Sequence, residues 1–241
     1  MRSGTFSRAA LLIVLAIGVR PAVAFTVAPA HLYLDVAAGA HEERTIALHD
    51  VNPPVMVSLG PFVIDPDGQP RRGGDNERSG VRWIVAVSDD EGMIRVVIDP
   101  PAGARGSYWS AVAISSRSDQ ITTRIVVPVV VTILGTESRA ITVQTMSAEA
   151  GEGEVMISAI ARNDGNTAVR VPLLITLESD QVEVASADID EILLLPGMTR
   201  RIKVHIQHET CKKERLTAIL AIRYADTASC IVWSMKSVTN S

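Results

Sequence analysis

The sequence contains few aromatic residues and very little cysteine. Only 4% of its 241 residues are aromatic, whereas 47% are hydrophobic, so any core must consist mainly of aliphatic side chains. Two cysteines cannot form the several bridges that hold small disulfide-rich domains together. The length suits one large domain or two domains of about 100 residues, and chains of that size bury enough apolar surface to fold without bridges.

The two cysteines, Cys211 and Cys230, leave two alternatives open. An exported protein can join them in a disulfide. However, the last two strands are expected to form a hairpin that turns near Asp226, with Cys230 beside the turn and Cys211 near the opposite end. At about 3.3 Å per strand residue, the thiols are then too far apart unless the loop that holds Cys211 folds back.

Excess positive charge and catalytic motifs are also missing. The formal net charge is −4, and no stretch of the sequence is basic enough to indicate binding of nucleic acid. The sequence contains no G-x-S-x-G, no H-E-x-x-H and no Walker-type loop. We therefore expect a protein that is not an enzyme, binds no nucleic acid and carries no cofactor.

Two groups of residues resemble metal ligands without completing a site. His205, His208 and Cys211 are one ligand short of a structural zinc site. The acidic groups at residues 89–91 and 188–191 lack the ligand spacing and the glycine of a calcium loop, so we interpret them as exposed turns. No metal is predicted.

The first 24 residues have the organisation of a secretory signal peptide. Arg2 and Arg8 precede an apolar run, Ala9–Val19, that is too short to span a bilayer. Ala22-Val23-Ala24 fits the small-x-small cleavage rule, which predicts a mature chain that begins at Phe25. We expect a periplasmic or secreted protein that is not inserted in the membrane after cleavage, and an uncleaved anchor is the alternative.

The mature chain has the pattern of an all-β protein. Apolar residues alternate or form short blocks, and turn signals recur about every ten residues, which predicts sandwiches or barrels. Asn163-Asp164-Gly165-Asn166 indicates a hairpin, and the three tryptophans are expected to fill the space between sheets. We predict two tandem immunoglobulin-like β-sandwich domains, residues 25–136 and 137–241, with about seven strands each.

The most prominent segment is Ile121–Leu134, which reads ITTRIVVPVVVTIL. It is nearly continuous in β-branched residues, which favour strands. Pro128 has no N–H to donate to a ladder, so the strand is expected to lie at a sheet edge or to be bulged there. A long apolar edge is either covered by the neighbouring domain or kept open for the strand of another chain. Both alternatives remain open.

The chain resembles the family of periplasmic pilus-assembly chaperones, as a divergent member. Four features of the first half carry the resemblance: the opening strand VAPAHLYLDV at residues 27–36, Asn52-Pro53 before a strand entered at Pro54-Val55, the turn Pro100–Tyr108 that leads into a strand, and the long apolar strand before the linker. The second half is similar to the second domain of the broader relatives, with Leu195-Pro196-Gly197 before a strand and a closing hairpin around Tyr224.

The resemblance implies a partner and a mode of binding. In this family, the last strand of domain one captures an exported, pilin-like subunit by β-strand addition. The alternate residues that would meet the subunit are Ile125, Val127, Val129, Val131 and Ile133. Arg124 falls at the position of one basic residue that binds the subunit's terminal carboxylate, and His31 falls at the position of the other.

A second function class stays open beside this one. Tandem immunoglobulin-like domains also serve as structural or adhesive surface modules, which need no open strand. The first class requires Arg124 and the row Ile125–Ile133 to be exposed between the domains. The second would place binding in loops such as Arg71–Gly80.

Overall fold

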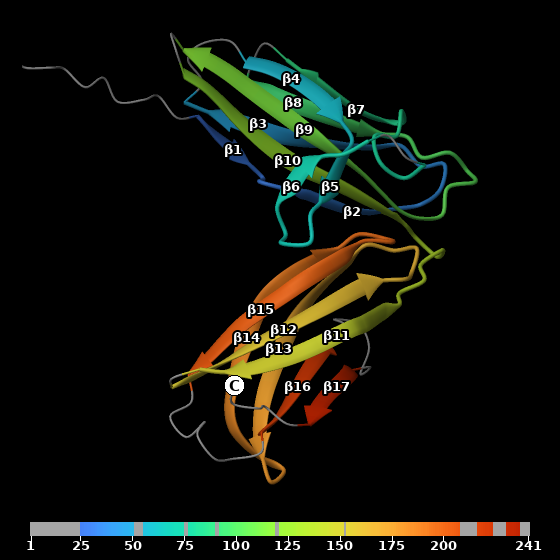
Figure 1. Ribbon diagram of the computed structural model, residues 1–241. Helices are drawn as coiled ribbons and strands as arrows, with labels where there is room; N and C mark the ends of the chain where they lie inside the picture. The colour runs from blue at the N-terminus through green and yellow to red at the C-terminus, as the bar shows by residue number, and fades with distance from the viewer. Residues whose placement is uncertain are drawn as a thin grey trace, which may run out of the picture.

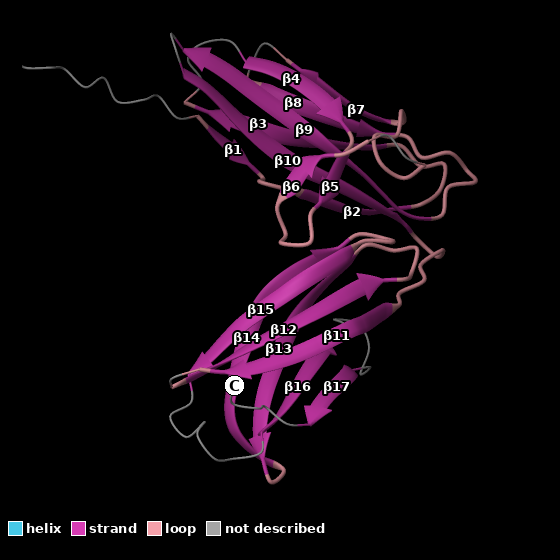
Figure 2. Cartoon of the chain, viewed as in Figure 1, coloured by secondary structure: helices cyan, strands magenta, loops and turns pink. Residues whose placement is uncertain are grey.

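The computed structural model describes residues 25–50, 55–74, 77–89, 92–118, 121–151, 153–207, 216–223 and 230–236. All regular elements in these ranges are β-strands, labelled β1 to β17, which confirms the predicted all-β class (Figures 1 and 2). Within these ranges, no helix has the length and apolar character needed to cross a membrane. The expected signal peptide and Cys211 lie outside the described residues, as does the side chain of Cys230, so the two cysteine alternatives remain open.

Two four-stranded sheets make up the N-terminal half. The first has the order β1-β3-β8-β7 and consists of β1 (Thr26–Ala28), β3 (Glu42–His49), β8 (Met93–Ile98) and β7 (Ile84–Ser88). The second has the order β2-β10-β9-β4 and consists of β2 (Leu32–Val36), β10 (Ile121–Ile133), β9 (Gly106–Ser118) and β4 (Val55–Gly60). A small hairpin of β5 (Phe62–Ile64) and β6 (Pro70–Arg72) lies outside both sheets.

One aliphatic core joins the two N-terminal sheets. Along β8 the side chains alternate between solvent and interior, as expected for a sheet with one face buried. Ile46 and Ile94 from the first sheet share a single buried cluster with Val112 and Val129 from the second. The two sheets therefore pack face to face.

The C-terminal half has the same plan. One sheet has the order β11-β12-β15 and consists of β11 (Ile141–Ala150), β12 (Glu154–Asn163) and β15 (Thr199–Gln207). The other has the order β14-β13-β16-β17 and consists of β14 (Val182–Leu194), β13 (Val169–Ser179), β16 (Leu216–Arg223) and β17 (Cys230–Lys236). A second aliphatic cluster draws on both sheets. Residues 134–140 connect the halves, and the predicted boundary at residue 136 lies within this segment.

The segment Asn163–Asn166 does not form the predicted hairpin. β12 pairs with β11 and β15, whereas β13 pairs with β14 and β16, so this segment crosses from one sheet to the other. The buried Asn163 amide donates to Thr167 O at 2.7 Å and Leu194 O at 2.8 Å, and its Oδ1 accepts from the Gly165 N–H. These bonds hold the segment Asn163–Asn166 in a corner between the two sheets, because an asparagine side chain can replace the backbone bonds of a strand ladder locally.

The acidic residues Asp188 and Asp190 lie in a strand, not in the expected turn. They belong to β14, which pairs with β13 from Val182 to Leu194 around a tight turn at Asp180 and Gln181. Both turn residues have positive φ, of 49° and 68°, although neither is glycine. β14 is an edge strand, and exposed acidic side chains on an edge discourage pairing with other chains.

Candidate functional site

The C-terminal part of strand β10 has a neighbouring strand on both sides, whereas its N-terminal part has one on a single side. β9 pairs with it along its whole length, from Ile121 to Ile133. On its other side, β2 pairs in parallel with Val129–Ile133 alone. In the described part of the chain, no strand pairs with Ile121–Pro128 on that side. Pro128 therefore lies where the paired region ends, at an edge, as its missing N–H predicts.

The alternate residues of β10 that were expected to meet a subunit, from Ile125 to Ile133, face the interior of their own half. Val127, Val129, Val131 and Ile133 are 0% exposed, and Ile125 is half-buried against the same core. The condition that the first function class set for this row, exposure between the halves, is therefore not met: these side chains cannot meet a partner, and only the backbone edge of Ile121–Pro128 is open. The reason is the period of two along a strand: when the odd-numbered residues meet the opposite sheet, the even-numbered ones face outward.

Arg124 and His31 are not neighbours. Leu32 is opposite Val129 in the parallel ladder, so His31 aligns with Pro128, four residues from Arg124. Four strand residues span about 13 Å. His31 is exposed, and its ring lies 4.7 Å from that of Tyr33. These two side chains do not form the paired clamp that the resemblance implies.

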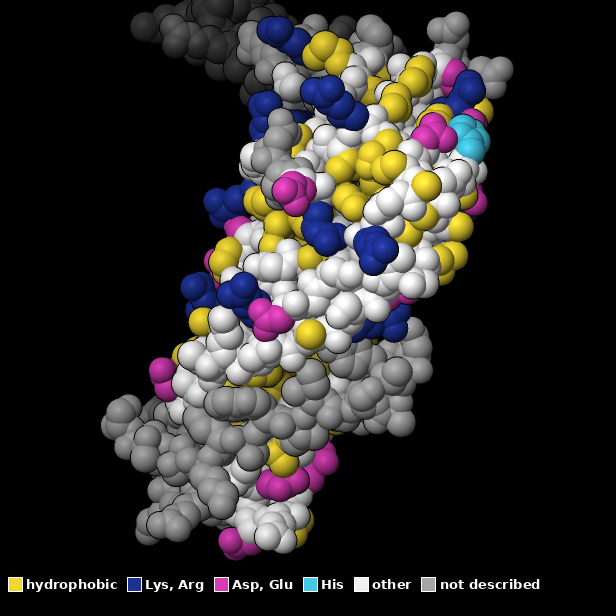
Figure 3. All heavy atoms as spheres, turned by 90° about the vertical axis from the view of Figure 1, so that its right-hand side faces the viewer, with side chains coloured by type: hydrophobic (Ala, Val, Ile, Leu, Met, Phe, Trp, Pro, Cys, Tyr) yellow, Lys and Arg dark blue, Asp and Glu magenta, His cyan; other side chains and the backbone are white. Residues whose placement is uncertain are grey.

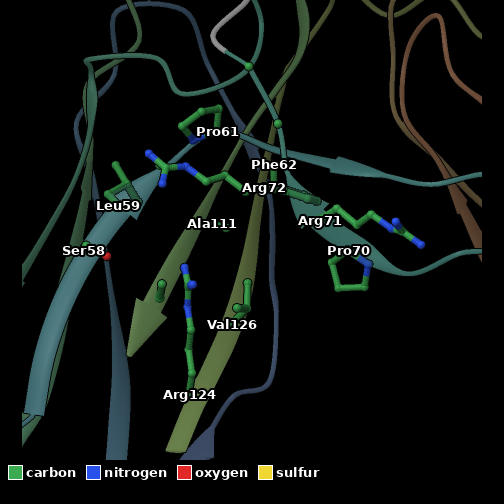
Figure 4. A pocket seen from close by; sticks show the side chains of 14 residues that line it. Ser58, Leu59, Pro61, Phe62, Pro70, Arg71, Arg72, Ala111, Arg124 and Val126 are labelled. Carbon is green, nitrogen blue, oxygen red and sulfur yellow. The ribbon is translucent and has the colours of Figure 1, made fainter. Parts of the chain in front are cut away.

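Arg124 instead lines a hollow on the outer face of the sheet. The hollow has a volume of about 700 Å³ and lies between the β4-β9-β10 face and the β5–β6 hairpin (Figure 4). Arg124 and Val126 line it from β10, and Arg71 and Arg72 line it from β6. Three arginines and no acidic residue line the hollow, and because Arg71 pairs with Asp65, Arg72 and Arg124 supply the positive charge that suits a ligand with negative charge.

The arginines of this hollow differ in their partners. Arg71 donates through Nε to the Asp65 carboxylate at 2.6 Å. The Asp65 carboxylate also accepts from the Gln69 N–H at 2.8 Å, and this bond, aided by Arg71, lowers the pKa of Asp65 below its ordinary value. The guanidinium groups of Arg72 and Arg124 make no hydrogen bond or ion pair with any residue that the structure describes.

An apolar cluster beside this hollow joins the two halves. Phe62 and Trp109 of the N-terminal half are 2% exposed, and Leu195 of the C-terminal half is 0% exposed. The Trp109 indole donates through Nε1 to Phe62 O at 2.9 Å. Trp109 belongs to the cluster that the two halves share, whereas Trp83 packs partly against the core between the N-terminal sheets, as expected. The side chain of Trp233 lies outside the described residues.

Polar contacts surround this cluster. The turn of the β5–β6 hairpin reaches toward the start of β15 (Figure 1). There the backbone N–H of Arg201 donates to Pro66 O at 2.7 Å, and the Arg201 guanidinium pairs with the Asp67 carboxylate at 2.9 Å. On the linker side, the Asn166 side chain binds the backbone of Thr136 and Ser138 at 2.9 and 2.7 Å. Specific side-chain bonds and a backbone bond therefore connect the two halves around the apolar cluster.

A second, smaller hollow lies between β2 and the C-terminal half. Arg170 stacks over the ring of Tyr33 at 4.3 Å and forms an ion pair with Glu191. Burial raises the pKa of Tyr33, and this effect outweighs the opposing influence of Arg170. Two arginines, Arg139 and Arg170, and two acidic residues, Asp35 and Glu191, line this hollow, so its formal charges balance and it has less to attract a charged ligand than the first.

Exposed apolar side chains gather mainly on the N-terminal half. Figure 3 shows such a patch, with basic and acidic side chains at its margins. Large exposed residues of this half include Met56, Val85 and Val87, which are 71%, 45% and 55% exposed. Val85 and Val87 belong to β7, the edge of the first sheet, so β7 is a second candidate for contact with another strand.

The sequence arguments missed the role of the β5–β6 hairpin. Residues 71–80 were expected to be a loop, but Arg71 and Arg72 belong to β6 and line the larger hollow. The signal was the turn Asp65-Pro66-Asp67-Gly68 between two short segments, which is typical of a hairpin. No metal-binding group of three or more ligand side chains occurs among the described residues, but His208 and Cys211 lie outside them.

No protein-family model and no curated protein matches the sequence.

Proposed function

We propose that this chain is an exported, chaperone-like binding protein that captures an extended segment of another exported protein by β-strand addition. In this proposal, the two halves are tandem immunoglobulin-like sandwiches. The client, a pilin-like or other β-rich subunit, pairs with the open stretch Ile121–Pro128 of β10. The function needs no catalytic group, cofactor or metal.

The observation that carries the proposal is the shape of β10. It is thirteen residues long, but β2 covers only its last five on the side away from β9. The exposed stretch offers unpaired N–H and C=O groups to an incoming strand. Thr122 and Arg124 are exposed there, so a partner can approach without displacing core side chains. Backbone bonds supply affinity in this mode of recognition, which suits clients of varied sequence.

The experiment is a titration of the isotope-labelled protein with a ten-residue peptide that alternates valine and threonine. We expect amide shifts and protection from hydrogen exchange at Ile121–Val127. Thr122 has the same parity as Pro128, so its N–H should point to the open side. A Thr122→Pro variant removes that N–H and places a ring in the path of the peptide, which should weaken binding by about tenfold.

The matched control is Thr122→Ala, which removes the same side chain and keeps the N–H. It should bind the peptide like the wild type. If the peptide shifts amides of β7 instead, or if Thr122→Pro binds as well as Thr122→Ala, the edge of β10 is not the binding site. The structural or adhesive function would then explain the chain better.

A further inference from the structure

The hollow under the β5–β6 hairpin, which we call the groove, has the size of a small-molecule site. Its volume of about 700 Å³ falls in the range of typical ligand pockets, about 300–1,000 Å³. It is hollow because β9 presents the small side chains of Ala111 and Ala113 on this face. The hairpin stands over these alanines and forms the opposite wall (Figure 4).

The floor of this groove is apolar. Val126 from β10 and the two alanines of β9 contribute aliphatic carbon, and Pro61 extends the floor toward the hairpin. Among the described residues that line the groove, none is acidic. Phe62 lines it too but is 2% exposed, so no aromatic face is free to stack on a base. This floor suits an alkyl group rather than a nucleotide.

Two guanidinium groups border this apolar floor. Arg72 comes from β6 and Arg124 from β10, and Figure 4 shows them reaching toward the same space from opposite sides. Neither has a partner among the described residues, whereas Arg71 turns away and pairs with Asp65. Two like charges beside one hollow repel each other, and an oxyanion between them converts the repulsion into two charge-assisted hydrogen bonds.

We propose that this groove binds an amphipathic oxyanion, with a carboxylate or phosphate head between Arg72 and Arg124 and an alkyl chain along the alanine floor. Guanidinium groups match both head groups because each presents a planar fork of donors to two oxygens. The site uses the face of the sheet, whereas strand addition uses its edge. It therefore goes beyond the proposed function and does not depend on it.

The test is calorimetric titration of the whole protein with dodecanoate and with dodecyl phosphate, each below its micelle concentration. These two probes separate the carboxylate and the phosphate sources of the same chemistry. We expect at least one of them to bind, with inorganic phosphate and dodecanol at least tenfold weaker. Arg72→Gln and Arg124→Gln should each weaken binding about tenfold or more, because each removes a charged hydrogen bond.

The control is Arg82→Gln, which removes an exposed arginine that does not line the groove and should leave binding unchanged. Ala113→Leu should block the alkyl chain by filling the floor, with circular dichroism to check that the variant is folded. The proposal is wrong if neither anion binds, if dodecanol binds as tightly, or if Arg72→Gln and Arg82→Gln behave alike. Arg72→Gln should leave the binding of the valine–threonine peptide unchanged, so this proposal and the strand proposal can fail separately.

Discussion

At the scale of single residues, Asp65 organises the turn of the β5–β6 hairpin. The Gln69 N–H and the Arg71 guanidinium both bind its carboxylate and lower its pKa from the ordinary 3.8. A folded-state pKa below the unfolded one means that ionised Asp65 stabilises the fold. This stabilisation is complete above the unfolded-state pKa and is lost as the pH falls through the folded-state pKa.

The corresponding experiment compares thermal unfolding of the wild type and Asp65→Asn between about pH 6 and pH 2. Below the ordinary aspartate pKa of 3.8, the wild type should lose stability more steeply than the variant, which has no charge to lose at this site. Equal slopes for the two proteins would mean that Asp65 gains nothing from its partners in the folded state.

A substitution at Val129 tests which face of β10 lies in the core. It is 0% exposed, so Val129→Ala should cost about 2–3 kcal/mol of unfolding free energy, from lost apolar burial and the cavity left behind. The same change at Val87, which is 55% exposed on β7, should cost far less. Denaturant unfolding measures both, and similar losses at the two positions would place Val129 outside the core.

The burial of alternate residues in β10 was the least predictable feature at this scale. Val127 and Val129 lie on one face, and Val126 and Val130 lie on the other, so hydrophobicity alone does not say which face is internal. Arg124 indicates which face is external, because a charged side chain without a partner does not point into a core. Its even-numbered face is the outer one.

At the scale of elements, the corner at Asn163–Asn166 packs against the linker. A Cβ added to Gly165 would lie 2.2 Å from Ser138 O and 2.9 Å from Ala140 N, both backbone atoms. Gly165→Ala should therefore push the corner and the linker apart and cost about 1–3 kcal/mol, the usual range for overpacking.

Gly103→Ala is the matched change without a clash, because nothing lies within 4 Å of its added Cβ and its φ is not in the left-handed region. It should be neutral or stabilise the protein by up to about 1 kcal/mol. Denaturant unfolding gives the free energies, and small-angle scattering reports whether the halves separate. A Gly165→Ala variant as stable as Gly103→Ala would show that the linker can yield.

Most strands could be predicted from the sequence, but their partners could not. Turn residues and alternating apolar positions are local signals, and they predict strands at Ile94–Ile98 and Thr199–Ile206, close to the observed bounds of β8 and β15. The pairing of an element depends on contacts distant in sequence. Asn163–Asn166 has the composition of a hairpin turn, yet the Asn163 side chain binds Leu194 O, thirty-one residues away, and directs the chain to the other sheet.

At the scale of the whole molecule, apolar packing holds the halves together more strongly than charge. Leu195 is 0% exposed in the shared cluster, so Leu195→Ala should cost about 2–5 kcal/mol. The Arg201–Asp67 pair has side chains that are 44% and 64% exposed, and Asp67→Ala should cost less than about 1 kcal/mol. Denaturant unfolding ranks the two, and a larger loss for Asp67→Ala would reverse this order.

The contact between the halves could not be foreseen from the sequence. A short linker predicts that two domains stay close, but it does not say which faces meet. Phe62 and Leu195 look like ordinary core residues of their own halves, and no pattern in either half marks them as partners. The edge of β10 was partly foreseeable, because Pro128 indicated an edge position.

The β5–β6 hairpin belongs to two structures at once. Its strands form the wall of the groove opposite the alanines, and its turn contacts the start of β15 in the C-terminal half. Because one hairpin makes both contacts, we expect a change in the width of the groove to be accompanied by a change in the angle between the halves. Spin labels on the two halves would report that angle, and their separation should change when dodecanoate or dodecyl phosphate fills the groove.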